Sequence, residues 1–334
     1  PLWEAVLTDD LRDRGGERDA SWEKMTRLWR AMVESVEGYD PARRSACNLT
    51  GGDARKVETC AVSLAGPVLT EIIATALKVG ECNACMGRIV AAPTAGASGV
   101  LPAVLLPIRK KYDFSEEKMV KALYVSAGFG QVIATRASIA GAEGGCQAEI
   151  GSASAMAAAA LVSLLGGTPE QMAAACATAL QNLLGLVCDP VAGLVEVPCV
   201  KRNVIGAVNA LTAAELALAG VENVIPCDEV IDAMRAVGDV MPTALRETGG
   251  GGLAAGVSTL AKLLNPHRAE DRRGAAGPVK PLRRFHLLWY TVSDPKKELL
   301  SMFTFHHFNF NVLDLERSLR FYKDALDLTP VRKK

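Results

Sequence analysis

The hydrophobic pattern up to residue 255 is helical almost throughout. Between Ser21 and Asp40, apolar side chains recur every three to four positions, which is typical of a surface helix with one buried face. Helix-start residues and the same periodicity predict further helices at residues 57–80, 117–142, 153–165, 169–187, 204–220 and 227–245, and directly after Gly99. Alternating runs of β-branched residues are scarce before residue 280. The sequence therefore predicts a mainly α fold.

The pattern changes in the last quarter of the chain. Residues 256–302 are rich in charge, Gly and Pro, which predicts a linker. Residues 303–312 then alternate strictly, and an amphipathic helix is expected at 314–325. This short β-α tail resembles the start of glyoxalase I proteins, in which the histidine matching His307 is a metal ligand. Because only one strand and one helix of that domain are present, we expect residues 303–334 to be a truncated fragment without function.

Composition narrows the function classes. The chain has 334 residues, 49% of them hydrophobic and 22% charged, so it can bury a sizeable core. The 37 basic and 37 acidic side chains balance, and no basic field favours nucleic acid or a membrane surface as a partner. The alanine-rich run at 153–166 is shorter than the ~20 residues that cross a bilayer. Nine cysteines without a signal-like N-terminal segment indicate a reducing, cytoplasmic environment.

Three cysteines lie at polar or Gly/Pro-punctuated breaks between helices. They are Cys146 in GGCQAEIG, Cys188 in LVCDPVAG and Cys199 in VEVPCVKRN. Their spacings of 42 and 11 residues match neither a zinc C-x-x-C pair nor a ferredoxin run, so a shared site would have to form through the fold. Thiolate ligands suit an iron-sulfur cluster or zinc, and three of them leave one coordination position open.

Longer motifs around these cysteines carry a family resemblance. CNLTGGD (47–53), NACMGRIVAAPTAGASGVLPAVL (83–105), GAEGGCQAEIGSASAMAAAALVSLLGGTPEQ (141–171), NLLGLVCDPVAGLVEVPCVKRN (182–203) and RETGGGGLA (246–254) resemble the alpha chain of iron-sulfur-dependent bacterial L-serine dehydratases. The resemblance covers roughly residues 3–255 and implies that residues 1–255 form a helical catalytic domain. It also implies a 4Fe-4S cluster held by Cys146, Cys188 and Cys199, with one iron free to bind L-serine, which is converted to pyruvate and ammonia.

Two Gly-containing turns are candidate binding sites for the substrate carboxylate. The turn in PTAGASG precedes a predicted helix, whose N-terminal N–H groups favour an anion. CNLTGGD offers a second turn of this kind. The polar residues directly after Cys199 would lie near any cluster that Cys199 binds. The candidate substrate-binding residues are Thr94, Gly96, Ser98, Thr50, Asp53, Lys201 and Asn203.

The general base is absent from the expected place. Residues 1–266 contain no histidine. In the family resembled, a histidine-bearing motif lies in the beta domain, so we expect a beta chain to supply the base within a homo- or hetero-oligomer. Glu149, Asp53 and Lys201 are the fallback candidates within this chain.

Two other readings remain open from the sequence. The chain could be a helical scaffold or binding subunit that keeps the fold without the chemistry. The run Gly249–Leu253 also resembles the phosphate loop of pyridoxal phosphate-dependent dehydratases, but the lysine context and alternating α/β pattern of that family are missing.

Overall fold

A computed structural model describes residues 1–256, 286–290, 308–312 and 330–333 of the chain. Contacts divide the chain into two units, Pro1–Leu263 and Leu264–Lys334, and each is described by itself. The predicted boundaries at residues 255 and 303 stay predictions, because most of the segment between them lies outside the described residues.

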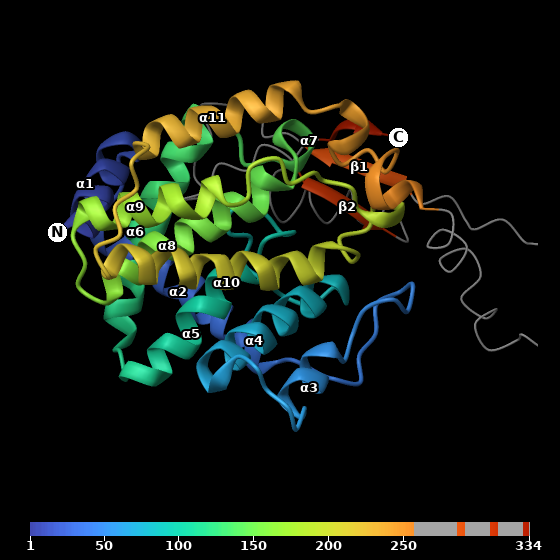
Figure 1. Ribbon diagram of the computed structural model, residues 1–334, viewed down its shortest axis with the longest axis horizontal. Helices are drawn as coiled ribbons and strands as arrows, with labels where there is room; N and C mark the ends of the chain where they lie inside the picture. Colours follow the sequence, from blue (N-terminus) through green and yellow to red (C-terminus); the bar gives the residue numbers. More distant parts are fainter. Residues whose placement is uncertain (257–285, 291–307, 313–329, 334) are drawn as a thin grey trace, which may run out of the picture. The chain divides into compact units, whose positions relative to one another are not determined.

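Residues 1–256 are helical, which confirms the predicted fold class (Figure 1). The α-helices described there are α1 (Leu2–Arg14), α2 (Arg18–Glu37), α3 (Asp53–Glu58), α4 (Gly66–Ala84), α5 (Val100–Tyr112), α6 (Glu116–Arg136), α7 (Gly141–Gly144), α8 (Ser152–Leu164), α9 (Pro169–Gln181), α10 (Cys199–Leu218) and α11 (Cys227–Val240). Short helical turns are η1 (Gln147–Gly151), η2 (Val191–Gly193), η3 (Thr243–Leu245) and η4 (Gly252–Ala255). Within the described part of the chain, no helix is both long enough and apolar enough to cross a membrane.

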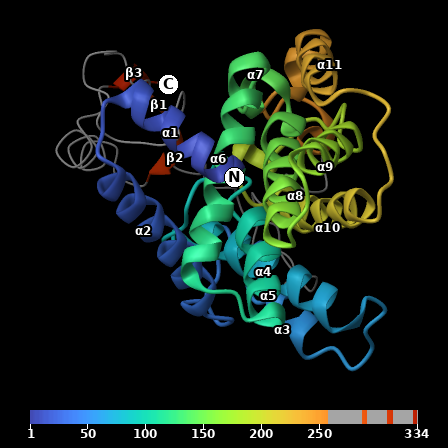
Figure 2. The same ribbon diagram turned by 90° about the vertical axis from the view of Figure 1, so that its left-hand side faces the viewer.

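Helix α8 forms the centre of this unit. Of its residues only Ser163 is not buried, and α8 packs against α5, α6, α9 and α10 (Figure 2). A helix that is apolar on all sides belongs in a core, and its many alanines let neighbouring helices approach closely. Gly206 likewise lets α10 approach η1 closely, because a Cβ on Gly206 would lie 2.9 Å from Ile150 Cγ2 of η1. Helix α10, which begins at Cys199, and η1, which directly follows Cys146, are thus held side by side.

Two predicted helices are interrupted in the structure. The single helix predicted at 57–80 is wrong, because residues 59–65 separate α3 from α4, which restarts with Pro67 in its first turn. The helix predicted at 117–142 ends at Arg136 as α6. Ser138 Oγ then accepts a hydrogen bond from the backbone N–H two residues later, which turns the chain before α7.

Other predicted helices differ at their ends. Helix α9 stops at Gln181, and the chain then turns at Gly185, whose φ of 83° is left-handed. Helix α11 stops at Val240, since Pro242 disfavours the helical conformation for the residue before it. Helix α10 begins at Cys199 rather than at residue 204. Helix α1 was not predicted, because its apolar residues do not form a clear face.

The second unit contains three described strands in the order β2-β1-β3. Strand β1 (His286–Tyr290) is antiparallel to β2 (Phe308–Val312), with His286 opposite Val312, and to β3 (Pro330–Lys333). Strand β2 coincides with the second half of the predicted strand. The first half of that strand and the helix predicted at 314–325 lie outside the described residues. Strand β1 lies within the segment for which the sequence predicts a linker.

Candidate metal centre

Three cysteines from three separate segments lie together in the interior. Cys146 directly precedes η1, Cys188 lies in the loop between α9 and η2, and Cys199 is the first residue of α10. Their exposed fractions are 3%, 3% and 9%. They are close enough that negative charge on Cys146 raises the pKa of both Cys188 and Cys199. The fold thus brings together the cysteines that the sequence singles out, and every cysteine of the chain is free of disulfides.

Long-range backbone hydrogen bonds fix the loop that carries Cys188. Its N–H donates to Leu245 O at 2.8 Å, and its carbonyl accepts from Glu247 N at 2.7 Å. Gln147, the residue after the first cysteine, donates its backbone N–H to Leu186 O at 2.9 Å. The loop is therefore attached both to η1 and to the segment after α11.

The surroundings of the three thiols disfavour their thiolate form. Burial raises the pKa of all three, and the nearby Glu149 carboxylate raises it further. The pKa of Cys146 reaches about 12, although the Arg202 guanidinium acts in the opposite direction. Thiolate is the form that binds metals, so a bound metal cation would have to displace these protons. The donor set fits a thiophilic metal group.

The arrangement does not suit a single metal ion. Among the described side chains, no group of three or more His, Cys, Asp and Glu converges closely enough to hold one ion. A structural zinc site needs its sulfurs about 2.3 Å from one point. In an iron-sulfur cluster, by contrast, different thiolates ligate different irons, so the thiols stand further apart. The described side chains therefore do not form a preformed site for one zinc ion.

Glu149 borders the three-cysteine centre from η1. Its Oε1 accepts a hydrogen bond from Thr94 Oγ1 at 2.7 Å, and Cys188 Sγ lies 3.7 Å from its Oε2. Burial raises the pKa of Glu149, while these two hydrogen bonds lower it. Because Thr94 uses its only hydroxyl proton on this carboxylate, it has none left to donate to a substrate carboxylate.

Arg202 and Asp189 form a buried ion pair beside the cysteines. Arg202 Nη2 lies 2.8 Å from Asp189 Oδ1, its Nη1 donates to Val187 O at 2.7 Å, and the guanidinium lowers the pKa of Cys146. The exposed fractions of the two paired side chains are only 14% and 3%. Asp189 Oδ2 additionally accepts from Leu253 N at 2.8 Å. In the Gly249–Leu253 run, this N–H thus binds a carboxylate of the protein itself rather than a cofactor phosphate.

The turn before α5 is fixed by Asn203. Asn203 Oδ1 accepts from Gly99 N at 2.8 Å, and its side-chain Nδ2 donates to Gly96 O at 2.7 Å and to Cys199 O at 2.9 Å. Both amide protons are therefore used, and Asn203 positions the turn against the start of α10. Ser98 Oγ is buried and has no hydrogen-bond partner among the described residues. Ser98 is thus the member of this turn with unused donor capacity.

The structure connects the remaining predicted residues less directly to the centre. Lys201 is exposed. Thr50 is buried, and its carbonyl accepts from Ser45 N at 3.0 Å. Asp53 begins α3 and pairs with Lys56 at 2.6 Å. No described hydrogen bond or ion pair joins Lys201, Thr50 or Asp53 to the three cysteines.

Helical spacing in the sequence could have indicated that Arg202, rather than Lys201, lies beside the three-cysteine centre. Residues three and four positions apart share a helix face. Arg202 and Asn203 stand in that relation to Cys199, whereas Lys201, two positions on, does not. The role of Asp189 had no such signal, because its partners lie on α10 and in the glycine-rich segment.

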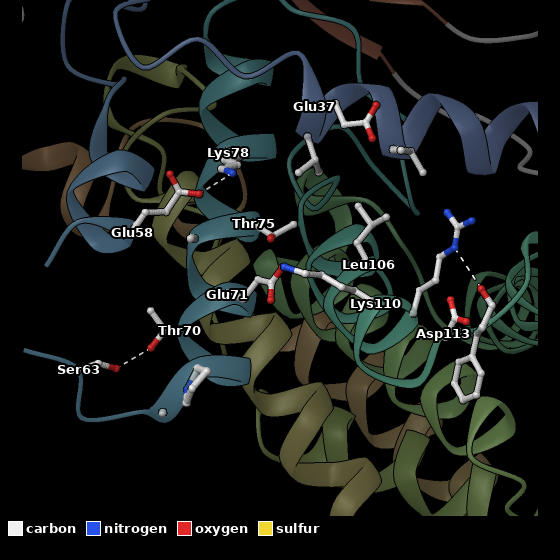
Figure 3. A pocket seen from close by; sticks show the side chains of 17 residues that line it. Glu37, Glu58, Ser63, Thr70, Glu71, Thr75, Lys78, Leu106, Lys110 and Asp113 are labelled. Carbon is white, nitrogen blue, oxygen red and sulfur yellow. Dashed lines mark hydrogen bonds and ion pairs between the residues drawn. The ribbon is translucent and has the colours of Figure 1, made fainter. Parts of the chain in front are cut away.

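A cavity of about 940 Å³ lies apart from the predicted site residues (Figure 3). It is lined by α2, α4, α5, the end of α3 and the loops beside them. Its charges are largely paired internally, by Lys78 with Glu58 at 2.6 Å and by Lys110 with Glu71 at 3.0 Å. None of the predicted cluster or substrate residues contributes to its lining.

Fold and site together define a helical protein with a buried three-thiol centre assembled from helix ends and a loop. The chain is a member of the serine dehydratase alpha chain family, which matches residues 1–254.

Individual relatives agree with this assignment. The chain is 58% identical over 228 residues to the Bacillus subtilis (strain 168) protein named "Probable L-serine dehydratase, alpha chain", covering 67% of this chain and 75% of that one. It is 56% identical over 192 residues to the L-serine dehydratase alpha chain of Peptoniphilus asaccharolyticus, covering 58% and 66%. L-serine dehydratase 2 of Escherichia coli (strain K12) is 46% identical over 181 residues, which are 54% of this chain and only 40% of that protein. The family resemblance is confirmed.

Proposed function

We propose that this chain is the alpha subunit of an L-serine dehydratase, an L-serine ammonia-lyase. The reaction removes the α-proton and the β-hydroxyl of L-serine as water and leaves 2-aminoacrylate, which is then hydrolysed to pyruvate and ammonia. Family membership supports the reaction, since relatives with 56–58% identity are named for it. The observation that carries the proposal is the set of three buried thiols drawn from three separate segments.

The proposed cofactor is a 4Fe-4S cluster ligated by Cys146, Cys188 and Cys199. Their burial, their proximity to one another and their lack of disulfides support this ligand set. A bound cluster with one iron open to substrate supplies a Lewis acid that helps the serine hydroxyl leave as water.

The chain's own residues would orient serine beside this centre. The turn before α5 offers the Ser98 hydroxyl and the N-terminal end of a helix, both suited to the substrate carboxylate. Asn203 positions this turn, and Thr94 orients Glu149. Because Gly96 has no side chain, the space beside Glu149 Oε1 stays open; a Cβ there would lie 3.2 Å from this oxygen. Contacts of Thr50, Asp53 and Lys201 with serine stay sequence-based predictions.

The proton acceptor is proposed to come from a partner chain. Residues 1–266 lack histidine, and relatives carry the name alpha chain, which supports a beta chain that completes the enzyme. The alpha and beta chains would then form a hetero-oligomer. Nine free thiols in the described structure support a reducing, cytoplasmic location.

Pyruvate formation tests the proposal. The anaerobically reconstituted chain should produce pyruvate from L-serine when a serine dehydratase beta chain is added and little without it. Cys188→Ser should abolish the reaction, whereas Cys60→Ser, which changes an exposed cysteine, should not. No pyruvate from an iron-loaded complex, or equal rates with Cys188→Ser, would contradict the proposed function.

A further inference from the structure

Glu149 carries a carboxylate for which the described structure provides no ion-pair partner. It is partly buried, and its recorded hydrogen bonds come from neutral groups, Thr94 and Cys188. The cation that most affects it is Arg202, whose guanidinium is bonded instead to Val187 O and Asp189. Charged groups inside proteins are normally paired with an opposite charge. A cation from outside the chain would complete this site.

The surroundings of the carboxylate are shaped by two glycines. A Cβ on Gly141 would lie 2.6 Å from Glu149 Oε2, and one on Gly96 would lie 3.2 Å from Oε1. Side chains at either position would therefore crowd the oxygens. Each oxygen has one recorded hydrogen bond, so lone pairs remain for further donors.

Glu149 also lies between the two other features that the proposed reaction requires. On one side is Cys188, a proposed cluster ligand, and on the other is the turn of Gly96 and Ser98, the proposed carboxylate site. An α-amino acid carries its ammonium group on the carbon between its carboxylate and its side chain. The position of Glu149 between the two sites matches that order.

We propose that Glu149 binds the α-ammonium group of serine and makes the site selective for α-amino acids over 2-hydroxy acids. This inference rests on the proposed function and names a binding residue for the α-ammonium group, the one substrate group to which the proposed function gives no partner. An ammonium group supplies both the positive charge and up to three hydrogen-bond donors. A 2-hydroxy acid supplies a neutral hydroxyl, which leaves the carboxylate without a counter-charge, and sites built for a polar group reject analogues that lack it.

Calorimetric titration with L-alanine and L-lactate tests the proposal. These probes differ only in the ammonium or hydroxyl on the α-carbon, and neither has the β-hydroxyl that leaves in the reaction. The protein is the anaerobically reconstituted full chain with its beta chain, compared at equal iron content. The variants are Glu149→Gln and, as a matched control, Glu143→Gln, which neutralises an exposed glutamate six residues earlier.

The unchanged protein and Glu143→Gln should bind L-alanine at least about 10-fold more tightly than L-lactate. Glu149→Gln should weaken L-alanine binding roughly 10- to 100-fold, as expected for a lost charge-assisted hydrogen bond, and should change L-lactate binding by less than about threefold. Equal affinity of the unchanged protein for both probes, or no affinity for either, would overturn the inference even if the variant failed to fold. Undiminished L-alanine binding by Glu149→Gln would overturn it as well. In either case pyruvate formation by the unchanged protein would leave the proposed function standing.

Discussion

Replacing Arg202 with methionine should destabilise the protein strongly even before any cofactor is bound. Methionine keeps the length of the side chain but removes its charge and donors. The substitution removes the hydrogen bonds to Val187 O and Asp189, of 2.7 and 2.8 Å. It also leaves the Asp189 carboxylate, 3% exposed, without its cation.

The expected size follows from that burial. Breaking a buried ion pair by removing one partner destabilises by about 3–5 kcal/mol. For a unit of this size, 1 kcal/mol corresponds to about 2–4 °C in melting temperature, so Arg202→Met should lower Tm by roughly 10 °C. Adding Asp189→Asn should recover at least about 1 kcal/mol, because the unpaired charge is then gone while an oxygen remains to accept from Leu253 N.

Thermal unfolding of the metal-free protein, followed by circular dichroism, measures this effect. Arg136→Met is the matched control, because Arg136 makes a comparable two-bond pair with Asp232 at 3.1 and 2.6 Å, but with exposed fractions of 39% and 55%. A surface pair contributes about 0–1 kcal/mol, so this variant should lose only a few degrees. Equal losses for the two arginine variants, or no recovery on adding Asp189→Asn, would refute the reasoning from burial.

Two further substitutions probe the centre. Gly141→Ala places a Cβ 2.6 Å from Glu149 Oε2, so it should destabilise the protein by about 1–3 kcal/mol and at least halve the iron bound per chain. The control Gly151→Ala, which has no neighbouring atom nearer than 3.8 Å, should change neither. Equal iron content in the two variants would contradict the steric argument. Ser98→Ala removes a buried hydroxyl without a recorded partner, so it should leave stability unchanged or raise it by about 1 kcal/mol, while KM for serine rises several-fold. An unchanged KM would exclude the hydroxyl from substrate binding.

The sequence predicted the features that depend on local pattern. The alanine-rich run at α8 is apolar on all sides, which indicates burial, and the Gly/Pro-punctuated segments correctly placed the three cysteines outside helix interiors. Helix ends were less predictable where a tertiary contact decides them. After α9, for example, the chain turns at Gly185, whose N–H donates to Gln147 Oε1 of η1 at 2.8 Å.

The polar partners of the centre could not be read from sequence for the same reason. Thr94 lies 55 positions from Glu149, and Asp189 lies 64 positions from Leu253. Nothing in either local pattern indicates the other member of the pair. That Thr94 donates its hydroxyl proton to Glu149 is visible only in the packed structure, and its contact with substrate stays a prediction.

The central claim is that Cys146, Cys188 and Cys199 together hold one iron-sulfur cluster. The most direct measurement is the iron and acid-labile sulfide content, with the visible spectrum, of anaerobically reconstituted protein and of the three single Cys→Ser variants, with Cys60→Ser as control. The account predicts about four iron and four sulfide per chain in the unchanged protein and in the control, and a large loss in each of the other three variants. Full cluster content in all three variants would contradict it.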